Sequence, residues 1–121
     1  THSILKAERL VLNCMQRMSG IATLTHHFTQ LLRHTKTKVL DTRKTTPNFR
    51  MLEKWAVKIG GGVNHRFGLY DMILLKDNHI DYAGGVEKAI LSTVDYLRKS
   101  NLNLKISIEA RNLKEVKEVI E

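Results

Sequence analysis

Apolar residues recur at helical spacing along the first third of the chain. Between residues 4 and 18 they are Ile4, Leu5, Leu10, Val11, Cys14, Met15 and Met18. This spacing predicts an amphipathic helix. Ser19-Gly20 interrupts the pattern, so we expect a second helix from residue 21 to about residue 32. Because the first helix begins almost at Thr1, we expect the chain to be a piece of a longer protein.

From residue 37 onward, short apolar runs alternate with helical patterns. Three runs read as buried strands, at residues 38–41, 72–76 and 104–109. Each is followed by helical spacing, at residues 49–59, 86–99 and 113–121. This repeated order of strand and helix predicts an α/β fold with a parallel sheet and right-handed crossovers.

Individual residues refine these helices. Pro47 is expected in the first turn of helix 49–59, where a missing N–H costs nothing. Asn112 is expected to cap the last helix, and Glu115 to complete a capping box. The residues expected to point inward from the first two of these helices are Leu52, Trp55, Ala56, Ile59, Ala89, Ile90, Val94 and Leu97.

Composition narrows the class of protein. With 42% hydrophobic residues in 121, the chain is globular, and its formal net charge of +8 predicts an anionic partner: nucleic acid, a membrane surface or a small polyanion. Aromatic residues are only 6%, and no nucleic-acid recognition motif is present, so nucleic acid is disfavoured. No run approaches the roughly 18 apolar residues of a membrane span.

The cysteine and the N-terminal sequence bear on location. Cys14 is the only cysteine, which excludes an intramolecular disulfide and suits a reducing compartment. Its place in an apolar helical pattern predicts a buried structural thiol. No signal peptide is visible, because the start lacks an apolar core and a cleavage site. We therefore expect a cytoplasmic protein without membrane contact.

Polar residues gather where the predicted strands end. Thr42-Arg43-Lys44, Lys76-Asp77-Asn78-His79 and Glu109 each follow a strand, and Asn64-His65-Arg66 lies in the loop before the second strand, after the glycines Gly60–Gly62. Side chains at one end of a parallel sheet converge, so we expect a cup of several cations and one carboxylate. Arginine binds a carboxylate or phosphate bidentately, whereas lysine acts as a compact charge.

Simpler interpretations exist for each cluster. Arg43-Lys44 is a possible solvated loop, His65 a possible structural histidine, Gly60–Gly62 a possible turn, Asp77-Asn78 a possible Asx-turn and Glu109 a possible surface partner of Arg111. Taken singly, each of these is favoured. Taken together at successive strand ends, they explain the pattern less well than one anion site does.

The segments around these clusters resemble the quinolinate phosphoribosyltransferase family. They are Ala7-Glu8-Arg9 with Asn13, QRMSGIAT (16–23), DTRKTTP (41–47), GGGVNHRFGLYD (60–71), KDNHI (76–80) and the IEAR strand end at Glu109. The resemblance covers nearly the whole chain, in order. It implies a smaller α/β domain joined to an α/β (TIM-like) barrel. The chain would then be a fragment of a two-domain enzyme: residues 1–36 form leading helices that link to the N-terminal domain, and residues 37–121 form the first βα units of the barrel.

The resemblance also implies an activity and roles for individual residues. The enzyme would transfer phosphoribose from phosphoribosyl pyrophosphate to quinolinate, releasing pyrophosphate and CO₂ and giving nicotinate mononucleotide for NAD biosynthesis. The implied quinolinate contacts are Arg43, His65, Arg66 and Lys76, with Thr42 beside them. Lys44 would face phosphoribosyl pyrophosphate, and Glu109 would bind Mg²⁺ or the ribose hydroxyls. Arg9 would reach a neighbouring subunit's site in a homodimer or larger homo-oligomer.

Three of these residues, Lys44, Lys76 and Glu109, are the implied catalytic set.

Two positions depart from the family pattern: Asn48 replaces a common glycine, and Ser107 a frequent glutamate. Asparagine tolerates a positive φ better than most residues, so the first departure is mild. The alternatives are a related enzyme for another carboxylate acceptor, such as nicotinate, and a basic nucleic-acid-binding module.

Overall fold

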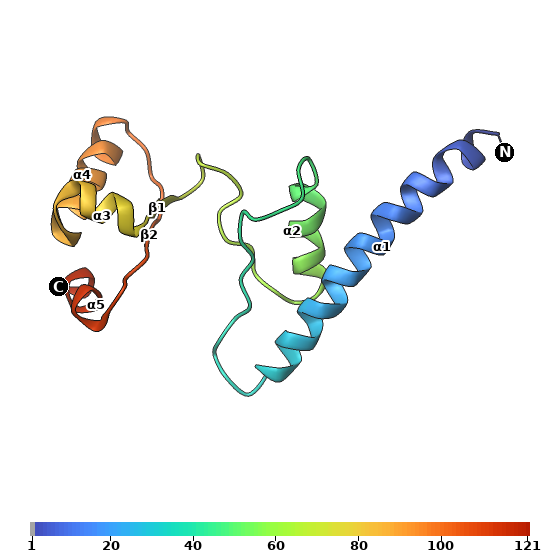
Figure 1. Cartoon of the computed structure of the whole chain (residues 1–121), viewed down its shortest axis with the longest axis horizontal. Helices are drawn as coiled ribbons and strands as arrows, with labels where there is room; N and C mark the ends of the chain where they lie inside the picture. Colours follow the sequence, from blue (N-terminus) through green and yellow to red (C-terminus); the bar gives the residue numbers. More distant parts are fainter. Residues whose placement is uncertain (1) are drawn as a thin grey trace. The chain divides into compact units, whose positions relative to one another are not determined.

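The computed structural model describes residues 2–121, and the chain divides into two compact units, Thr1–Phe67 (unit 1) and Gly68–Glu121 (unit 2). It is an α/β protein (Figure 1). Its elements are α1 (His2–Leu31), α2 (Arg50–Ile59), β1 (Ile73–Leu75), α3 (Asp77–Ala83), α4 (Val86–Lys99), β2 (Ile106–Ile108) and α5 (Leu113–Ile120). The expected domain division at residues 36 and 37 stays a prediction.

The N-terminal third of the chain is one helix, not two. α1 runs for 30 residues straight through Ser19-Gly20, so the expected break there is wrong. A glycine inside a helix costs only about 1 kcal/mol relative to alanine, which packing against a neighbouring helix readily offsets. That neighbour is α2, which lies beside the C-terminal half of α1 (Figure 1).

The glycines after α2 let this helix end close to α1. A Cβ on Gly60 would lie 2.4 Å from the carbonyl oxygen of Ala22 and 2.6 Å from the Cβ of Thr25, both on α1. Thr25 is also the buried residue of α1, and the Thr29 hydroxyl donates to the Gly60 carbonyl over 3.1 Å. The lack of a side chain at Gly60 therefore permits a close backbone approach to α1.

The buried face of α2 carries charge. Ala56 is fully buried, but Trp55 and Ile59 are 57% and 60% exposed, so their expected inward positions are wrong. Glu53 and Lys54 occupy the buried face instead, with 6% and 3% of their surfaces exposed. An amphipathic pattern identifies the apolar residues of a helix but does not show which of its charged residues find partners inside.

Glu53 fastens α2 to α1 and to the turn before α2. Its carboxylate accepts from Nε and Nη2 of Arg17 at 3.0 and 2.8 Å, and from the hydroxyl and backbone N–H of Thr46 at 2.8 and 3.1 Å. Burial works to raise the pKa of Glu53. The bonds from Thr46 and Arg17 outweigh it, so the pKa lies below its ordinary value of 4.5.

Pro47 lies in a turn before α2 rather than in its first turn. The Phe49 N–H donates to the Thr46 carbonyl over 3.0 Å, and Asn48 has a φ of 60°. Proline followed by a residue of positive φ is the signature of a type II turn. Asn48 thus adopts the conformation for which asparagine is a tolerable replacement of glycine.

Two extended segments of unit 1 pair in parallel, although neither is long. The expected strand at residues 38–41 is reduced to a single parallel bridge between Leu40 and Val63. The Val63 N–H donates to the Val39 carbonyl over 2.8 Å, and the Asp41 N–H donates to the Val63 carbonyl over 3.2 Å. Sequence analysis placed Val63 in a loop, so its pairing is a further correction.

Unit 2 contains the parallel pair of strands that the sequence predicts. β1 and β2 pair with Ile73 opposite Ile106 and Leu75 opposite Ile108. Its core consists of Leu75, Ile80, Val86 and Ala89, with Ile73, Ala83, Ile90, Ile106, Ile108 and Val119 packed against them. The helix α4 has the predicted bounds, and Ala89 and Leu97 point inward as expected, whereas Val94 is 38% exposed.

The short helix α3 was not expected from the sequence. It follows β1 directly and ends at Gly84, which has a φ of 81°. At the other end of unit 2 the Asn112 side chain accepts from the Glu115 N–H over 3.0 Å, as expected of an N-cap. The Glu115 carboxylate, however, accepts from the N–H of Arg111 rather than from that of Asn112, so the capping box is not formed as expected.

Apolar side chains lie exposed along α1. They include Ile4, Leu5, Leu10, Val11 and Met15, which are 51–71% exposed. Cys14 is only half-buried, not the buried thiol that the sequence predicts. Within residues 2–121, no helix has the length and apolar character needed to cross a bilayer.

The contact between Gly60 and α1 predicts opposite effects of two alanine substitutions. Gly60→Ala should lower the free energy of unfolding by about 1–3 kcal/mol, because its methyl group collides with the backbone of α1. Gly20→Ala is the matched control, since nothing lies within 4 Å of its Cβ position. It should raise stability by about 0.5–1 kcal/mol. Urea unfolding of the complete gene product measures both, and equal effects would contradict the close approach.

The bonded carboxylate of Glu53 predicts a pH-dependent contribution to stability. Its pKa is lowered in the folded state, so its stabilisation is present above the unfolded value and is lost as the pH falls through the folded value. Glu53→Gln should therefore cost roughly 1.5–3 kcal/mol at pH 7, and the gap to the wild type should narrow in acid. Glu8→Gln, at an exposed position of α1, should show no gap at either pH. A Glu53→Gln gap of constant size in thermal melts would contradict the assignment.

Candidate active site

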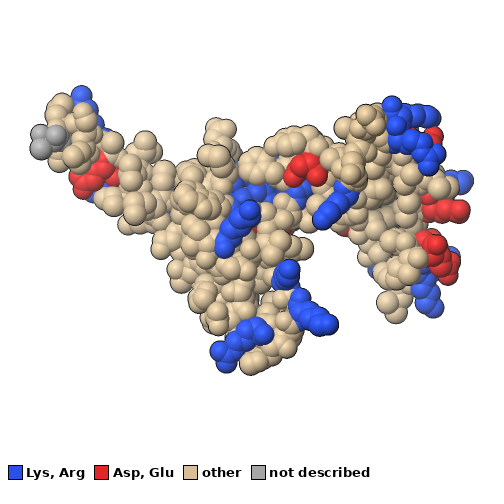
Figure 2. Space-filling view, turned by 180° about the vertical axis from the view of Figure 1, so that it is seen from behind, with Lys and Arg blue, Asp and Glu red and all other residues tan. Residues whose placement is uncertain are grey.

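Lysine and arginine side chains lie exposed on the loops of unit 1. Figure 2 shows such side chains at the turn after α1, where Arg33, Lys36 and Lys38 are exposed and no acidic residue lies between them in the sequence. On unit 2 both signs of charge are interspersed in the same view. Unit 1 is therefore the more electropositive of the two.

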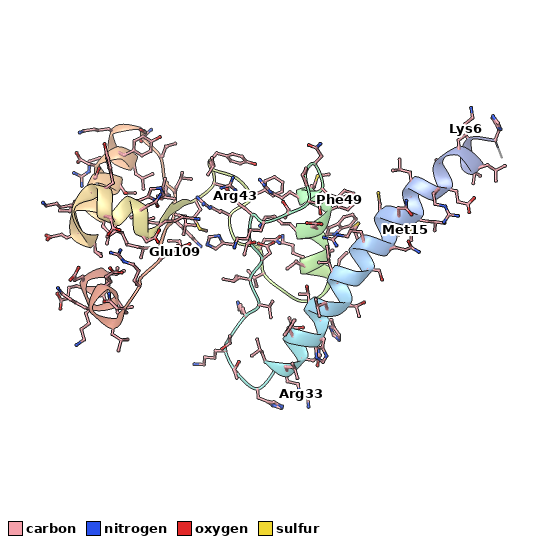
Figure 3. The ribbon with its side chains drawn as sticks, in the orientation of Figure 1. Lys6, Met15, Arg33, Arg43, Phe49 and Glu109 are labelled. Carbon is pink, nitrogen blue, oxygen red and sulfur yellow. The ribbon has the colours of Figure 1, made fainter. Side chains whose placement is uncertain are left out.

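The parallel segments of unit 1 bring two predicted clusters to the same end. Residues 39–41 lead into Thr42-Arg43-Lys44, and the parallel residue Val63 leads into Asn64-His65-Arg66. Figure 3 labels Arg43 at this end of the segments. The backbones that lead into these two clusters therefore lie side by side, while the convergence of their side chains on one ligand stays a prediction.

Asp41 joins the two segments to α2. Its carboxylate forms an ion pair with Lys54 Nζ and accepts from the Asn64 side-chain amide, and its Oδ1 also accepts from the His65 N–H at 2.8 Å. Lys54 Nζ donates in turn to the His65 carbonyl over 3.1 Å, and the Asn64 amide to the Lys54 carbonyl over 2.8 Å. We call Asp41, Lys54, Asn64 and the backbone of His65 the Asp41 cluster.

Arg50 connects the same loops from the other side. Its guanidinium donates from Nε to the Thr45 hydroxyl, from Nη1 to the Phe67 carbonyl and from Nη2 to the Arg43 carbonyl, over 3.1, 3.2 and 3.4 Å. The Thr42 hydroxyl accepts from the Lys44 N–H over 3.0 Å and shapes the turn between them. Two donors of this arginine thus hold backbone carbonyls of the candidate site, and a third holds the Thr45 side chain.

The cations of unit 1 fall into two groups. Arg17, Arg50 and Lys54 use their side-chain donors on protein acceptors. The side chains of Arg43, Lys44, His65 and Arg66 make no hydrogen bond or ion pair with the residues that the structure describes. Arg43 Nε is buried and has no partner, which no other buried side-chain nitrogen or oxygen shows within residues 2–121. A buried donor without an acceptor costs about 1–3 kcal/mol, so an anionic ligand would relieve this cost.

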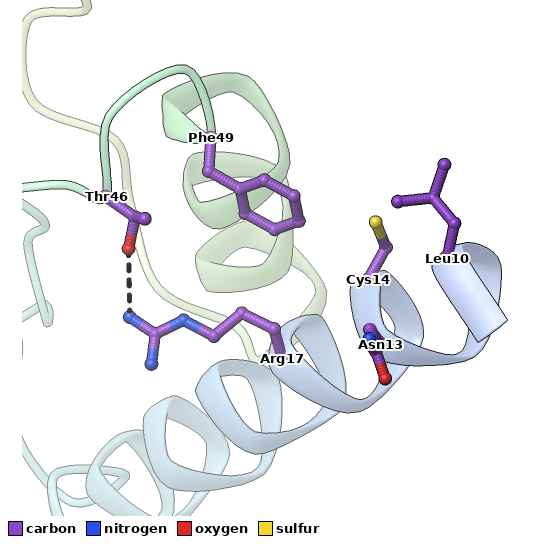
Figure 4. A pocket seen from close by; sticks show the side chains of 6 residues that line it. All are labelled: Leu10, Asn13, Cys14, Arg17, Thr46 and Phe49. Carbon is purple, nitrogen blue, oxygen red and sulfur yellow. Dashed lines mark hydrogen bonds between the residues drawn. The ribbon is translucent and has the colours of Figure 1, made fainter.

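Cavities lie beside these loops. One of about 220 Å³ is lined in part by Asp41, Thr42, Lys44 and Lys54. Another, of about 360 Å³, is lined in part by Thr45, Arg50 and Phe67. A cavity of about 290 Å³ is lined by Leu10, Asn13, Cys14, Arg17, Thr46 and Phe49 (Figure 4). Figure 4 also shows the Arg17 guanidinium donating to the Thr46 hydroxyl, over 3.4 Å.

Unit 2 brings Lys76 and Glu109 together at the end of its strands. Lys76 follows β1 and Glu109 follows β2, and the Glu109 N–H donates to the Leu75 carbonyl over 2.9 Å. Both side chains are exposed and make no hydrogen bond or ion pair within the described chain. His79 has a structural contact, because its Nδ1 accepts from the Lys76 N–H over 3.0 Å at the start of α3.

Glu109 is not paired with Arg111. Arg111 bonds to Asp81 on α3 and to Glu115 on α5, with Nη2 at 2.8 Å from each carboxylate. The hydrogen bonds from Arg111 lower the pKa of Glu115, and the bonds to Glu115 and Asp81 raise the pKa of Arg111. The carboxylate of Glu109 therefore remains available for a ligand.

Some predicted features lie apart from these clusters. Arg9 is on the exposed N-terminal part of α1 and has no ion-pair partner among residues 2–121. No group of three or more His, Cys, Asp or Glu side chains in that range is arranged to hold a metal ion. Ser107 lies within β2, opposite Leu74.

Sequence reasoning missed the residues that hold the site loops and α2 in place. Arg50, Lys54, Asp41 and Asn64 hold the site loops, whereas Arg17 and Glu53 hold α2 against α1. Their partners are 5 to 36 residues away in the sequence, so no local pattern pairs them. The available signal was the adjacent pair Glu53-Lys54 within a helix that packs against another.

Comparisons with known proteins identify relatives of the whole chain. The family model described as quinolinate phosphoribosyl transferase, C-terminal domain, matches residues 21–121. The nicotinate-nucleotide pyrophosphorylase (carboxylating), chloroplastic, of Arabidopsis thaliana is 52% identical over 120 residues, which are 99% of this chain and 34% of that protein. Quinolinate phosphoribosyltransferase (decarboxylating) 1b of Nicotiana tabacum is 55% identical with the same coverage.

Solved structures are similar as well. NadC from Streptococcus pyogenes is 44% identical with a TM-score of 0.88, over 98% of this chain and 41% of that one. The nicotinate-nucleotide pyrophosphorylase from Francisella tularensis is 47% identical with a TM-score of 0.87, over 99% and 41%. The chain spans about a third of the length of the curated relatives it matches. With a family model over residues 21–121 and relatives more than 50% identical along 99% of its length, the chain belongs to the quinolinate phosphoribosyltransferase family.

Proposed function

We propose that the protein containing this chain transfers phosphoribose from phosphoribosyl pyrophosphate to quinolinate. The products are nicotinate mononucleotide, pyrophosphate and CO₂, in the biosynthesis of NAD. Support comes from the family, whose relatives carry the names of this reaction. Both substrates are polyanions, and the chain supplies the unpaired cations that such substrates need.

Arg43 carries the proposal most directly. Its buried Nε has no acceptor, while its loop is fixed by Arg50 and adjoins Asp41. We assign Arg43, His65, Arg66 and Lys76 to the two quinolinate carboxylates, with Thr42 beside them. Lys44 and Glu109 serve the phosphoribosyl pyrophosphate side.

The chemistry suits residues that act through charge and position. Displacement of pyrophosphate at the anomeric carbon passes through an oxocarbenium-like state, which needs no protein nucleophile. Lys44 stabilises the negative charge on the donor's phosphates, and Glu109 holds the ribose side. Lys76 and the arginines stabilise negative charge on the pyridine ring as CO₂ leaves.

The candidate site residues include one carboxylate, that of Glu109, which suits a divalent cation. Mg²⁺ is commonly bound through one or two carboxylates together with substrate phosphates rather than by an all-protein cage. Glu109, exposed at the end of β2 and free of side-chain partners in the described chain, is the residue that would hold it. The ion would neutralise charge on the pyrophosphate leaving group.

The wider architecture is also part of the proposal. We place the chain at the start of a TIM-like barrel, preceded by a smaller domain and joined to partner copies in a homodimer or larger homo-oligomer. The expected cytoplasmic location stays a prediction, since relatives are described as chloroplastic in Arabidopsis thaliana and mitochondrial in Nicotiana glauca.

An assay of acceptor choice tests the activity itself. The complete gene product is incubated with phosphoribosyl pyrophosphate, Mg²⁺ and either quinolinate or nicotinate. We expect nicotinate mononucleotide and CO₂ from quinolinate, and at least tenfold lower kcat/KM with nicotinate, because one carboxylate is lost. Preference for nicotinate would support the related enzyme, and salt-dependent RNA binding without turnover would support the nucleic-acid module.

Arg66→Lys tests bidentate recognition of quinolinate. Lysine keeps the charge but cannot form two parallel bonds to one carboxylate. The variant should lose on the order of 10²-fold in kcat/KM for quinolinate, since roughly 3 kcal/mol of charge-assisted bonding is removed. Arg98→Lys, on the exposed surface of α4, is the control and should behave as the wild type. Near-normal kinetics of Arg66→Lys would refute its assignment.

Mixing two inactive variants tests the sharing of sites between subunits. Arg9→Ala removes the residue that we assign to a partner's site, and Lys76→Ala removes one from the subunit's own site. In a mixed oligomer, one type of site keeps both residues, so activity should return on subunit exchange. Absence of recovery, with exchange shown by differently tagged subunits, would count against shared sites.

A further inference from the structure

The Asp41 cluster closes a ring through three parts of unit 1. The side chain of Asp41 belongs to the segment that leads to Arg43, Lys54 belongs to α2, and Asn64-His65 leads to Arg66. Only 8% of the Asp41 side chain and 4% of the Lys54 side chain are exposed. The carboxylate accepts from three different residues, with Oδ1 bonded to Lys54 and to the His65 N–H and Oδ2 to Asn64.

Stability alone does not account for this ring. Removing two charges from water costs about as much as their attraction returns, and apolar residues of similar volume often serve stability better. Apolar residues, however, would not orient the backbone of the neighbouring loop through hydrogen bonds. The cluster bonds both backbone groups of His65, the N–H to Asp41 and the carbonyl to Lys54. It thereby fixes the two peptide planes that flank this residue, and with them the start of Arg66.

The cluster also pairs the positive charge of Lys54 within the protein, so that this charge does not act on a ligand. Lys54 would otherwise add another positive charge beside Arg43, Lys44 and Arg66, and would compete for an anionic ligand. Its ammonium instead donates to Asp41 and His65. The four residues without side-chain partners keep their donors for substrate.

We propose that Asp41, Lys54 and Asn64 are positioning residues that set the affinity of the site for the acceptor dicarboxylate. This inference rests on the proposed function, in which His65 and Arg66 face quinolinate. Lys44 is held separately, through the Thr42 hydroxyl, and the adjoining Thr45 through Arg50. Loss of the cluster should therefore affect quinolinate more than phosphoribosyl pyrophosphate.

The test compares the ion pairs made by two buried residues of one helix, Lys54 and Glu53, in the complete gene product. Lys54→Met breaks the pair with Asp41, and Glu53→Gln weakens the pair with Arg17. The acidic partners, Asp41 and Glu53, are each 8% exposed. We expect both variants to melt at lower temperature. Lys54→Met should raise the KM for quinolinate about 10- to 100-fold and leave that for phosphoribosyl pyrophosphate within about threefold, because small misplacements of binding groups have effects of this size. Glu53→Gln should keep both KM values.

The outcomes separate the possibilities. If the wild type does not use quinolinate, the proposed function fails. If the wild type does, but Lys54→Met raises both KM values equally or neither, the positioning role fails. Should Lys54→Met not fold, Asn64→Ala carries the test, because it deletes only the amide bonds to Asp41 and Lys54. It should raise the KM for quinolinate severalfold, and an unchanged value would overturn the inference.

Discussion

Two adjacent charges on the buried face of α2 set the arrangement of unit 1. An ion inside a protein without a partner costs several kcal/mol, so Glu53 and Lys54 must each find an opposite charge or a set of donors. Glu53 forms an ion pair with Arg17 on α1 and accepts a hydrogen bond from Thr46 before α2. Lys54 forms an ion pair with Asp41. The helix therefore has a defined place relative to α1 on one side and to the site loops on the other.

The need for buried charges to have partners divides the cationic side chains of unit 1 into those bonded to protein acceptors and those left for a ligand. Arg17, Arg50 and Lys54 are held by protein acceptors, whereas the side chains of Arg43, Lys44, His65 and Arg66 have no hydrogen bond or ion pair among residues 2–121. A site that binds polyanions needs its donors in place before the ligand arrives, since reorganising them during binding or reaction would cost free energy. The net charge of +8 does not distinguish these tasks, but the contacts do.

Local signals in the sequence predicted local features well. Asn112 caps α5 through its own side chain, α4 has the expected bounds, and the strands before Lys76 and Glu109 are parallel. Failures occurred where a distant contact overrides a local preference. Gly20 does not end α1, because α2 packs along it, and Trp55 is exposed, because Lys54 has an acidic partner inside. The candidate residues came from motifs and a family resemblance, while the residues that hold them could be found only from the folded chain.

The short sequence separations within the Asp41 cluster have a consequence for folding. Asp41 contacts Lys54 and His65 across only 13 and 24 residues, and the chain entropy lost in closing a loop grows with the logarithm of its length. The bonds that orient His65 thus lie within residues 41–65, and they can form without contacts to more distant segments. Contacts of this range favour rapid folding. The loops that carry Arg43 and His65 therefore close within one continuous stretch of unit 1, independently of α1.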